Sequence, residues 1–348
     1  MIERAEVLII GGGPAGLATA IEARRAGLEA MVVDRRRPPV DVACGEGLMP
    51  AGVDRLLGLG VRIPEAEAGI FRGVRYLDGE VVADARFSAG AGLGVRRTAL
   101  HRAMLQRAEE LGVEFRWKTS VRSLHDTEVE TEKGRYRGRW LVAADGRLSR
   151  LRTIAGIATS VPTRQRFGVR RHYQRPPWTD TVEVYWADEC EAYVTPVGPE
   201  MVGVAVLSQV RPLDFDRQIQ HFPTLAHRLV GVPIASRDRG AGPFGHRPST
   251  VVRDRLALVG DASGSLDPIT GEGVSVAIGQ ARALVRAISS GSLSDYVADH
   301  RRIMRLPRLL TELLLVAERR PRLRRLTIRF FAANPRLFSR LVNVIGRS

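Results

Sequence analysis

The residues most suited to chemistry near the start of the chain are a cluster of glycines. Gly11-Gly12-Gly13-Pro14-Ala15-Gly16 has the spacing G-x-G-x-x-G, and Asp34 lies 18 residues after Gly16. In this pattern the first glycine permits a tight turn, the second lets the backbone approach a pyrophosphate, and the third lets a helix and a strand pack closely. An acid about 20 residues further on suits a ribose hydroxyl. The motif therefore predicts a dinucleotide site, with Arg35 beside Asp34, and by itself leaves FAD and NAD equally open.

The elements around this turn agree with that prediction. Residues 5–10 (AEVLII) form an apolar, partly β-branched run that indicates a buried parallel strand. Residues 15–25 have helical composition, and residues 28–34 (LEAMVVD) indicate a second strand. A helix that begins at such a turn offers free N–H groups and the positive end of its dipole to phosphates.

Two later segments carry an acid at the end of a predicted strand. Residues 139–152 (RWLVAADGRLSRLR) run into Asp145-Gly146, with Ser149 and Arg152 close behind. Residues 255–284 run into Gly260-Asp261, then a loop rich in glycine and proline, then a helix from about Gly273.

With these three motifs in this order, the sequence resembles the FAD-dependent oxidoreductases that contain aromatic-ring hydroxylases (the para-hydroxybenzoate hydroxylase fold), geranylgeranyl reductases and flavin-dependent halogenases. The resemblance covers most of the chain and implies FAD as the cofactor. It also implies an α/β (α+β) fold, in which a Rossmann-like FAD-binding domain carries an inserted antiparallel β-sheet substrate domain and a C-terminal helical region.

The resemblance also implies roles for particular residues. Asp261 would bond the ribityl or pyrophosphate region of FAD, and the loop from Pro268 to Gly273 would lie beside the isoalloxazine ring. Arg97 of the stretch Arg97-Thr98-Ala99-Leu100 would contact the phosphates, although the neighbouring Arg96 leaves the register open by one residue. Together the motifs and the resemblance predict these cofactor contacts: Gly11, Gly13, Pro14, Ala15, Gly16, Asp34, Arg35, Cys44, Gly45, Arg97, Asp145, Gly146, Gly260, Asp261, Pro268, Gly271, Glu272, Gly273 and Val274.

Residues 44–50 (CGEGLMP) are similar to a Cys-Gly-rich loop that lies near the flavin in the reductase branch. Cys44 could tune the flavin or touch substrate, or it could be a small buried thiol. Glu46 could donate a proton, or it could be a solvated loop acid. Cys44, Glu46 and Pro268 are the catalytic candidates.

Between residues 164 and 207, four segments of 6–9 residues alternate with Pro and Gly, which predicts an antiparallel sheet. In the resembled superfamily such a sheet walls the substrate cavity. The candidate substrate contacts are His172, Tyr185, Tyr193 and Thr195. Tyr193-Val194-Thr195-Pro196 stands where geranylgeranyl reductases carry an aromatic W-x-F-P stretch, so the sequence departs from that branch here.

Charge and composition separate the end of the chain from the rest. The net charge is +15, and residues 301–348 hold 13 Arg against Glu312 and Glu318, a net of +11, which leaves +4 for the remainder. Pro307, Pro321 and Pro335 are expected to divide this end into short helices. A basic amphipathic helix can lie on an anionic membrane; alternatively, the apolar stripe packs on the domain and the arginines face water. No nucleic-acid motif accompanies the charge, so nucleic acid is not expected as a partner.

We expect the FAD-binding domain to comprise residues 1–75, 95–160 and 250–290. The substrate domain would comprise 76–94 and 161–249, and the basic helical region 291–348. Cys44 and Cys190 are too far apart in sequence to suggest a metal site. The chain shows neither a signal-peptide layout nor an apolar run of about 20 residues. We therefore expect a cytoplasmic protein, or one peripheral at the inner membrane face.

Two reactions on a hydrophobic small molecule remain, and monooxygenation is the favoured one. It would be a hydroxylation or epoxidation through a C4a-hydroperoxyflavin. The alternative is saturation of isoprenoid C=C bonds, as in geranylgeranyl reductases, and a non-catalytic redox sensor is a third possibility. The glycine loops favour saturation, whereas the missing W-x-F-P favours monooxygenation. The loop D-P-I-T-G-E-G disfavours halogenation. No second G-x-G-x-x-G is present, so NAD(P)H would bind transiently, or an external reductase would supply electrons.

Overall fold

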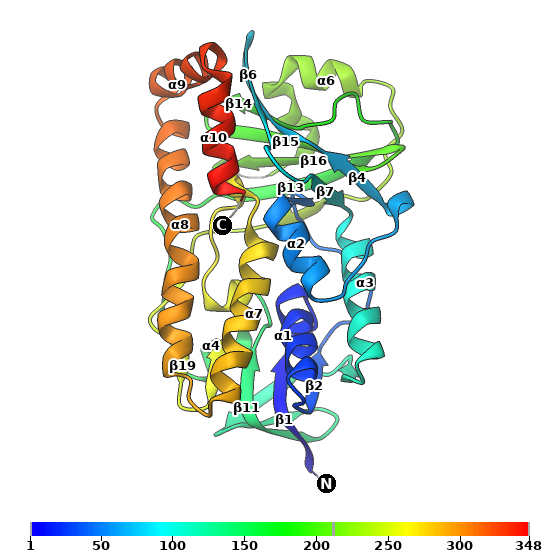
Figure 1. The fold of residues 1–348 in the computed structure, drawn as a ribbon, viewed down its shortest axis with the longest axis vertical. Helices are drawn as coiled ribbons and strands as arrows, with labels where there is room; N and C mark the ends of the chain where they lie inside the picture. The colour runs from blue at the N-terminus through cyan, green and yellow to red at the C-terminus, as the bar shows by residue number, and fades with distance from the viewer. Residues whose placement is uncertain (1, 211–212, 347–348) are drawn as a thin grey trace.

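The computed structural model describes residues 2–210 and 213–346, so the first residue of the predicted FAD-binding domain and the last two of the predicted helical region lie outside it. Two large sheets lie toward opposite ends of the molecule's long axis, and helices run beside and between them (Figure 1). The helices are α1 (Pro14–Arg25), α2 (Pro50–Gly58), α3 (Arg97–Glu110), α4 (Arg150–Ile154), α5 (Phe215–Gln218), α6 (Pro223–Leu229), α7 (Gly273–Ser289), α8 (Ser294–Glu318), α9 (Pro321–Ala333) and α10 (Pro335–Ile345).

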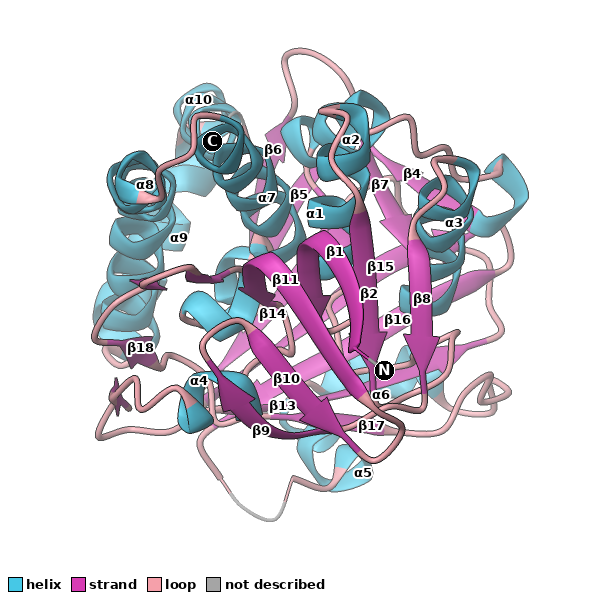
Figure 2. Cartoon of the chain, turned by 90° about the horizontal axis from the view of Figure 1, so that it is seen from below, coloured by secondary structure: helices cyan, strands magenta, loops and turns pink. Residues whose placement is uncertain are grey.

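The first sheet has the order β19-β20-β11-β1-β2-β8, with β9 and β10 added at β11, and its central strands are parallel (Figure 2). Its strands are β1 (Ile2–Ile10), β2 (Ala30–Asp34), β8 (Glu114–Trp117), β9 (Val121–His125), β10 (Glu128–Thr131), β11 (Arg135–Ala143), β19 (Val252–Arg253) and β20 (Leu256–Leu258). Side chains of α1, α3 and α7 cover one face, and β9, β10 and α4 cover the other. Burial on both faces explains why β1 and β2 read as continuous apolar runs rather than alternating ones.

The second sheet has the order β17-β13-β16-β15-β14-β5-β6. Its strands are β5 (Gly73–Asp78), β6 (Val81–Arg86), β13 (Phe167–Tyr173), β14 (Val182–Ala187), β15 (Cys190–Gly198), β16 (Met201–Ser208) and β17 (Arg239–Ala241). The four predicted strands are β13 to β16, which pair antiparallel as expected. Among the described strands of this sheet, only β14 and β5 pair in parallel. A small sheet of β3 (Gly47–Leu48), β4 (Ala68–Phe71) and β7 (Gly92–Val95) packs beside β15, and β12 (Thr159–Ser160) pairs with β18 (Arg247–Pro248).

The two faces of the second sheet have different neighbours. Tyr185, Val194 and Val204 pack against α5 and α6, while His172 and Thr195 face the loop around Cys44. All seven residues of β13 are buried, so neither face of that strand is open to water as simple alternation would suggest.

The C-terminal helices differ from the expectation at one proline. Pro321 and Pro335 begin α9 and α10, where a missing N–H costs nothing because the first turn of a helix leaves its N–H groups unpaired. Pro307, however, lies inside the 25-residue α8 and does not end it. Its ring is buried, and packing of α8 along α7 offsets the lost backbone hydrogen bond. The expected break at Pro307 is therefore wrong. The division into domains stays a prediction, and its boundary after residue 75 falls within β5.

Candidate functional site

The glycine turn joins β1 to α1 through close backbone packing. Gly11 has φ +113°, and a Cβ on it would lie 2.3 Å from the carbonyl oxygen of Ala144. A Cβ on Gly16 would lie 1.8 Å from the carbonyl oxygen of Gly11. Gly13 differs, because its φ is an ordinary −78° and its Cβ would meet only the guanidinium of Arg97, at 4.0 Å. Gly11 and Gly16 are thus required by the fold, whereas Gly13 leaves space free at the N-terminus of α1.

Asp34 at the end of β2 holds this turn in place. Its buried carboxylate accepts hydrogen bonds from the backbone N–H groups of Gly12 and Arg36, both at 2.7 Å. The Arg36 guanidinium returns to the same carboxylate at 3.5 Å, while Arg35 is exposed. The basic neighbour of Asp34 is therefore Arg36. The predicted cofactor contact at Arg35 stays a prediction.

Helix α3 brings two side chains to the turn. Arg97 is its first residue, and the Nε of this guanidinium is buried without a hydrogen-bond partner. Burial lowers the pKa of Arg97, while Cys44, Asp261 and Glu46 act in the opposite direction. His101, one helical turn later, lies 2.7 Å from the Gly12 carbonyl oxygen through its Nε2. Sequence reasoning missed His101, although its i+4 spacing from Arg97 was a usable signal.

Residues 144–152 hold Asp145, Ser149 and Arg152, and their hydrogen bonds connect two loops. Asp145 accepts hydrogen bonds from the Ser149 hydroxyl at 2.5 Å and from the Leu151 N–H at 3.0 Å, so its carboxylate caps α4. Arg152 donates to the carbonyl oxygens of Ala262 at 2.9 Å and Arg147 at 3.0 Å. Asp145 therefore shapes the loop rather than presenting a free carboxylate, and the motif's arginine ties this loop to the one that carries Asp261.

Asp261 presents an accessible carboxylate between two arginines. The residue is exposed, yet surrounding protein raises the pKa of its carboxyl group, and the charges of Arg97 and Arg147 lower it. The short turn Gly260–Ser263 that carries it is held by a 2.7 Å bond from the Gly260 N–H to Gln280 of α7. Arg147 is a second residue that sequence reasoning did not select.

Bare backbone from several loops faces open space in this region. A Cβ added at Gly45, Gly146, Gly271 or Gly273 would meet no atom within 4 Å. With Gly13 they come from four segments, and each segment lies after a strand of the parallel sheet, namely β1, β2, β11 or β20. In open α/β sheets the ligand lies outside the carboxyl ends of the strands. We call the open space beside these glycines the recess. With the Arg97 Nε, which lacks a hydrogen-bond partner, and the accessible Asp261 carboxylate, it suits an extended dinucleotide.

The loop after Cys44 makes the most connected buried cluster near this recess. Glu46 is buried at φ +61°, and its Oε1 accepts from the Arg97 backbone N–H at 2.8 Å. Its Oε2 lies 2.5 Å from Nε2 of the fully buried His172. Nδ1 of His172 faces Nη1 of Arg170 at 2.9 Å, and a guanidinium can only donate. His172 therefore carries its proton on Nε2 and donates it to Glu46.

Cys44 lies beside this cluster as a thiol. Its Sγ accepts from the Glu46 backbone N–H at 3.4 Å. Burial raises the pKa of the Cys44 thiol, Arg97 lowers it, and the net direction is upward. Cys44 is therefore protonated at neutral pH and poorly suited to act as a nucleophile.

The four predicted substrate contacts are divided between the two faces of the second sheet. His172 faces Glu46, the Thr195 hydroxyl donates to the Gly45 carbonyl oxygen at 2.9 Å, and the Tyr193 hydroxyl donates to the Ile269 carbonyl oxygen at 3.1 Å. These three therefore meet the loops at Gly45 and Pro268. Tyr185 lies on the opposite face, where its hydroxyl donates to Glu183 at 2.6 Å and its ring packs against Phe222. The structure does not bring Tyr185 to the recess, because side chains alternate along a strand.

A second buried cluster anchors the loop that begins before Pro268. Arg166 pairs with Glu191 at 2.5 Å and with Asp267 at 2.8 Å, and all three side chains are buried. Burial and the neighbouring acids raise the pKa of Glu191 to about 7, against the lowering effect of Arg166. None of these residues was singled out from the sequence, since the three positions are far apart along the chain.

The recess is part of a fold that known families share. A family model described as "FAD binding domain" matches residues 4–291. The chain belongs to this FAD-binding family. Its curated relatives include a menaquinone reductase of Mycolicibacterium smegmatis, which is 28% identical over 324 residues, covering 85% of this chain and 79% of the relative. A digeranylgeranylglycerophospholipid reductase of Methanothermobacter thermautotrophicus is 25% identical over 335 residues, covering 90% and 83%.

Solved structures share the fold of this flavoprotein. The flavin-dependent brominase Bmp2 superposes with a TM-score of 0.85 at 21% identity, covering 99% of this chain and 94% of the other. Pseudomonas aeruginosa PqsL in complex with 2-aminobenzoylacetate gives a TM-score of 0.73 at 21% identity, covering 86% and 91%. At such identities the likeness concerns the fold alone. The predicted α/β FAD-binding fold and the cofactor class are thus confirmed, and the individual contacts remain predictions.

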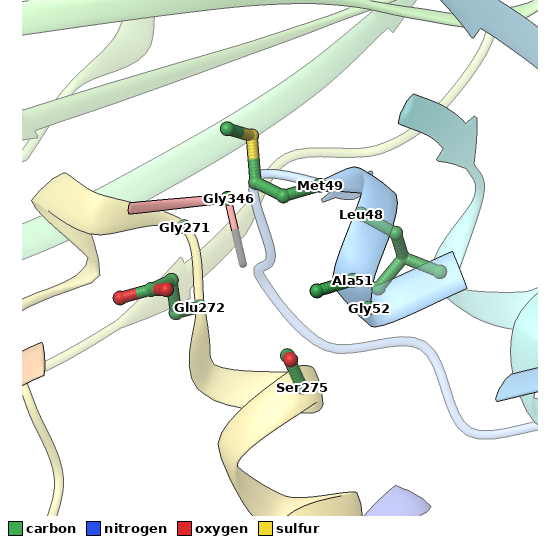
Figure 3. A pocket seen from close by; sticks show the side chains of 8 residues that line it. All are labelled: Leu48, Met49, Ala51, Gly52, Gly271, Glu272, Ser275 and Gly346. Atoms are coloured by element: carbon green, nitrogen blue, oxygen red, sulfur yellow. The ribbon is translucent and has the colours of Figure 1, made fainter. Parts of the chain in front are cut away.

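A narrow hollow lies where three segments converge (Figure 3). They are the start of α2, the turn before α7 and the end of α10. The Ala51 N–H donates to the Gly346 carbonyl oxygen at 3.1 Å, and Gly271 and Glu272 form the opposite wall. The end of the described chain therefore lies against the turn that is predicted to adjoin the isoalloxazine ring.

Proposed function

We propose that this flavoprotein reduces a C=C bond of a hydrophobic substrate, with the Glu46–His172 pair as its proton source. One arrangement carries the proposal: a buried carboxylate that holds an imidazole N–H at 2.5 Å, in the loop predicted to lie beside the isoalloxazine ring. Addition of hydrogen to an alkene needs one proton at this place. The similarity to two curated proteins named as reductases supports the same reaction class.

When bound and reduced, FAD supplies a hydride, which is one hydrogen nucleus with two electrons. One carbon of the substrate accepts it, and the π electrons of the C=C bond take a proton at the other carbon. In the arrangement described, both oxygens of Glu46 accept hydrogen bonds, so the pair first takes up a proton from solvent. Glu46 then gives this proton to the carbon, and the pair returns to its starting state. Arg170, at 2.9 Å from His172 Nδ1, fixes the tautomer in which the proton points at Glu46.

The remaining residues of the recess would bind and orient the cofactor. The N-terminus of α1 and Arg97 suit the pyrophosphate, because both are positive and the Arg97 Nε lacks a partner. Asp261 suits hydroxyl groups of the ribityl chain. We propose that NAD(P)H, binding transiently, reduces the flavin, with an external reductase as the alternative electron donor.

Monooxygenation of a hydrophobic small molecule is the second candidate. It is favoured by Tyr193, which stands in the stretch that departs from geranylgeranyl reductases and bonds the Ile269 carbonyl oxygen at 3.1 Å. The stretch in which the sequence differs from geranylgeranyl reductases therefore contacts the loop that is predicted to lie beside the isoalloxazine ring. A non-catalytic redox sensor is disfavoured by the buried proton-holding pair, which such a protein does not need.

Product mass separates the two reactions. The holoprotein is reduced with dithionite, which removes any dependence on the natural donor, and is mixed with an isoprenoid alcohol, because a quinone would gain two hydrogen atoms simply by reduction of its ring. The reductase proposal expects a product that gains two hydrogen atoms in the absence of oxygen. A product that gains one oxygen atom, and forms only when oxygen is admitted, would overturn it in favour of monooxygenation.

A further inference from the structure

Each of the last three helices carries an outward row of large apolar side chains. Leu309, Leu313 and Val316 lie on α8 at i, i+4 and i+7, and α9 and α10 repeat the pattern with similar spacing. Residues so spaced share one helix face. The nine side chains, which we call the outer rows, are 40–66% exposed: Leu309, Leu313, Val316, Leu323, Leu326, Phe330, Leu337, Leu341 and Val344.

The outer rows are additional to the faces by which these helices pack on the protein. Met304 of α8, Ile328 of α9, and Phe338 and Val342 of α10 are buried. The ring of Phe338 stacks on Phe331 at 4.7 Å and so joins α10 to α9. The simple alternative, in which the apolar stripe packs inward and only arginines face water, therefore does not describe these helices, because they are apolar on two sides.

The concentration of exposed apolar side chains is local. Of the 17 exposed large hydrophobic residues among those that the structure describes, nine lie between positions 309 and 344. Single exposed leucines need no explanation, whereas a contiguous group marks an interaction site.

Arginines flank the outer rows throughout. Residues 301–346 contain 12 Arg and two acids, Glu312 and Glu318, a net charge of +10. One of the acids, Glu318, is buried, and the other, Glu312, pairs with Arg247 at 2.6 Å. Exposed arginines beside the rows are Arg305, Arg319, Arg320, Arg322, Arg325, Arg329, Arg336 and Arg340. Along the middle of α8, an open hollow is lined by Arg301, Arg302, Arg305, Arg308, Leu309 and Glu312.

From these observations we infer that the outer face of α8, α9 and α10 docks on an anionic lipid bilayer. The apolar rows enter the boundary between headgroups and acyl chains, and the arginines pair with lipid phosphates. A second copy of this chain is a poor occupant, since two such faces would bring +10 against +10. Within the described residues no helix is long and apolar enough to cross a membrane, so the contact is a peripheral one.

The docking face ends at the recess. Leu341 and Val344 belong to α10, and Gly346, two residues beyond Val344, closes the hollow beside Gly271 and Glu272. One end of the docking face therefore lies beside the turn that is predicted to adjoin the isoalloxazine ring. The docking itself does not rest on the proposed function.

Sedimentation with vesicles tests the docking directly. The FAD-loaded protein is mixed with vesicles of phosphatidylcholine alone or of phosphatidylcholine and phosphatidylglycerol in equal parts. We expect it to sediment with the anionic vesicles, to bind the neutral ones at least about tenfold less, and to be released by high salt, which screens the arginines.

A triple variant, Leu326→Ser, Phe330→Ser and Leu341→Ser, should lose at least about tenfold of the binding to anionic vesicles. It should keep its FAD and its reaction with a water-soluble substrate, which shows that it is folded. The matched control is Leu148→Ser with Val230→Ser, which removes two other exposed apolar side chains (76% and 78% exposed) and should bind as the wild type does.

Equal sedimentation of the wild type and the triple variant would overturn the inference. So would a dimer in sedimentation equilibrium that the triple variant abolishes without any vesicle binding by the wild type, because that result assigns the face to a second copy. Vesicle binding without C=C reduction would leave the docking intact and count against the proposed function alone.

Discussion

At the scale of single residues, the site depends on a carboxylate whose two oxygens have different partners. Oε1 of Glu46 accepts from the backbone of Arg97 and Oε2 from His172, so the side chain cannot rotate without losing one bond. The φ of +61° at Glu46 is unusual for a residue with a Cβ, and it turns the side chain inward between Gly45 and Gly47. A strained, buried, paired acid in a glycine loop is better explained by chemistry than by packing.

The first prediction concerns this acid. Glu46→Gln keeps the shape and can still accept from His172 through its one carbonyl oxygen, but its amide NH2 then faces the Arg97 N–H, and the side chain can no longer take up a proton. We expect the rate of substrate reduction to fall by about 100-fold or more, which is the usual size of a general-acid contribution. The measurement is the single-turnover rate of flavin reoxidation without oxygen, with FAD content checked in parallel.

Glu110→Gln, at an exposed position at the end of α3, is the matched control and should leave that rate unchanged. An unaltered rate in Glu46→Gln would remove Glu46 from the reaction and leave it a structural link between the loop and β13.

Residues of the site differed in how far the sequence could reveal them. Gly11, Gly13 and Gly16 lie together in one turn, so a local pattern was enough to find them. Glu46 and His172 were each candidates, but they are 126 positions apart, and no local pattern could predict their hydrogen bond. The ion pair between Arg36 and Asp34 was not predicted, because composition does not show which of two adjacent arginines contacts the acid at the end of β2.

At the scale of elements, α8 is held to the FAD-binding domain by a buried imidazole. His300 is 3% exposed, and its Nε2 lies 3.0 Å from the Ser263 hydroxyl in the turn that carries Asp261. Burial and Arg308 lower the pKa of His300 from 6.5 to about 4. The helix is thereby tied to the turn by a neutral side chain.

The second prediction rests on that shift. Because the unfolded chain takes up the proton at a higher pH than the folded one, His300 reduces stability as the pH falls from 6.5 toward 4. We expect the free energy of unfolding to drop by about 2 kcal/mol more in the wild type than in His300→Asn between pH 7 and pH 5. Urea unfolding at both pH values measures it, and the difference between the two proteins cancels the other titrating groups.

Equal pH dependence in the wild type and His300→Asn would contradict this prediction, because it would mean that the imidazole takes up its proton at the same pH in the folded and the unfolded chain. The matched control is His221→Asn, which replaces an exposed histidine.

Elements were predicted well where burial is simple. The strands β1, β2 and β13 to β16 were all predicted. Each was found because its own local sequence pattern is typical of a β-strand. The effect of Pro307 was predicted wrongly, because a proline locally tends to end a helix, while the buried contacts of α8 with α7 come from residues far away. The recruitment of β5 and β6 into the second sheet was likewise set by long-range pairing.

At the scale of the whole molecule, the recess exists only because several loops converge. Gly13, Gly45, Gly146, Gly271 and Gly273 lie in segments spread over 260 residues of the chain, and the two sheets bring them to one place. Three motifs in order predicted this assembly through the resemblance to a known fold. They did not predict the outer rows of the last helices, whose exposure depends on which face packs inward.

The central claim is that FAD lies along this glycine-lined recess, and the most direct measurement is titration of the apoprotein with FAD. Gly13→Ala and Gly58→Ala each add one methyl group at a glycine with ordinary φ and no atom closer than 4.0 Å, but only Gly13 faces the recess. We predict one FAD per chain, an affinity about 30-fold or more weaker for Gly13→Ala (roughly 2 kcal/mol), and no change for Gly58→Ala. Equal affinities in all three proteins, or an apoprotein that takes up no FAD, would contradict the account.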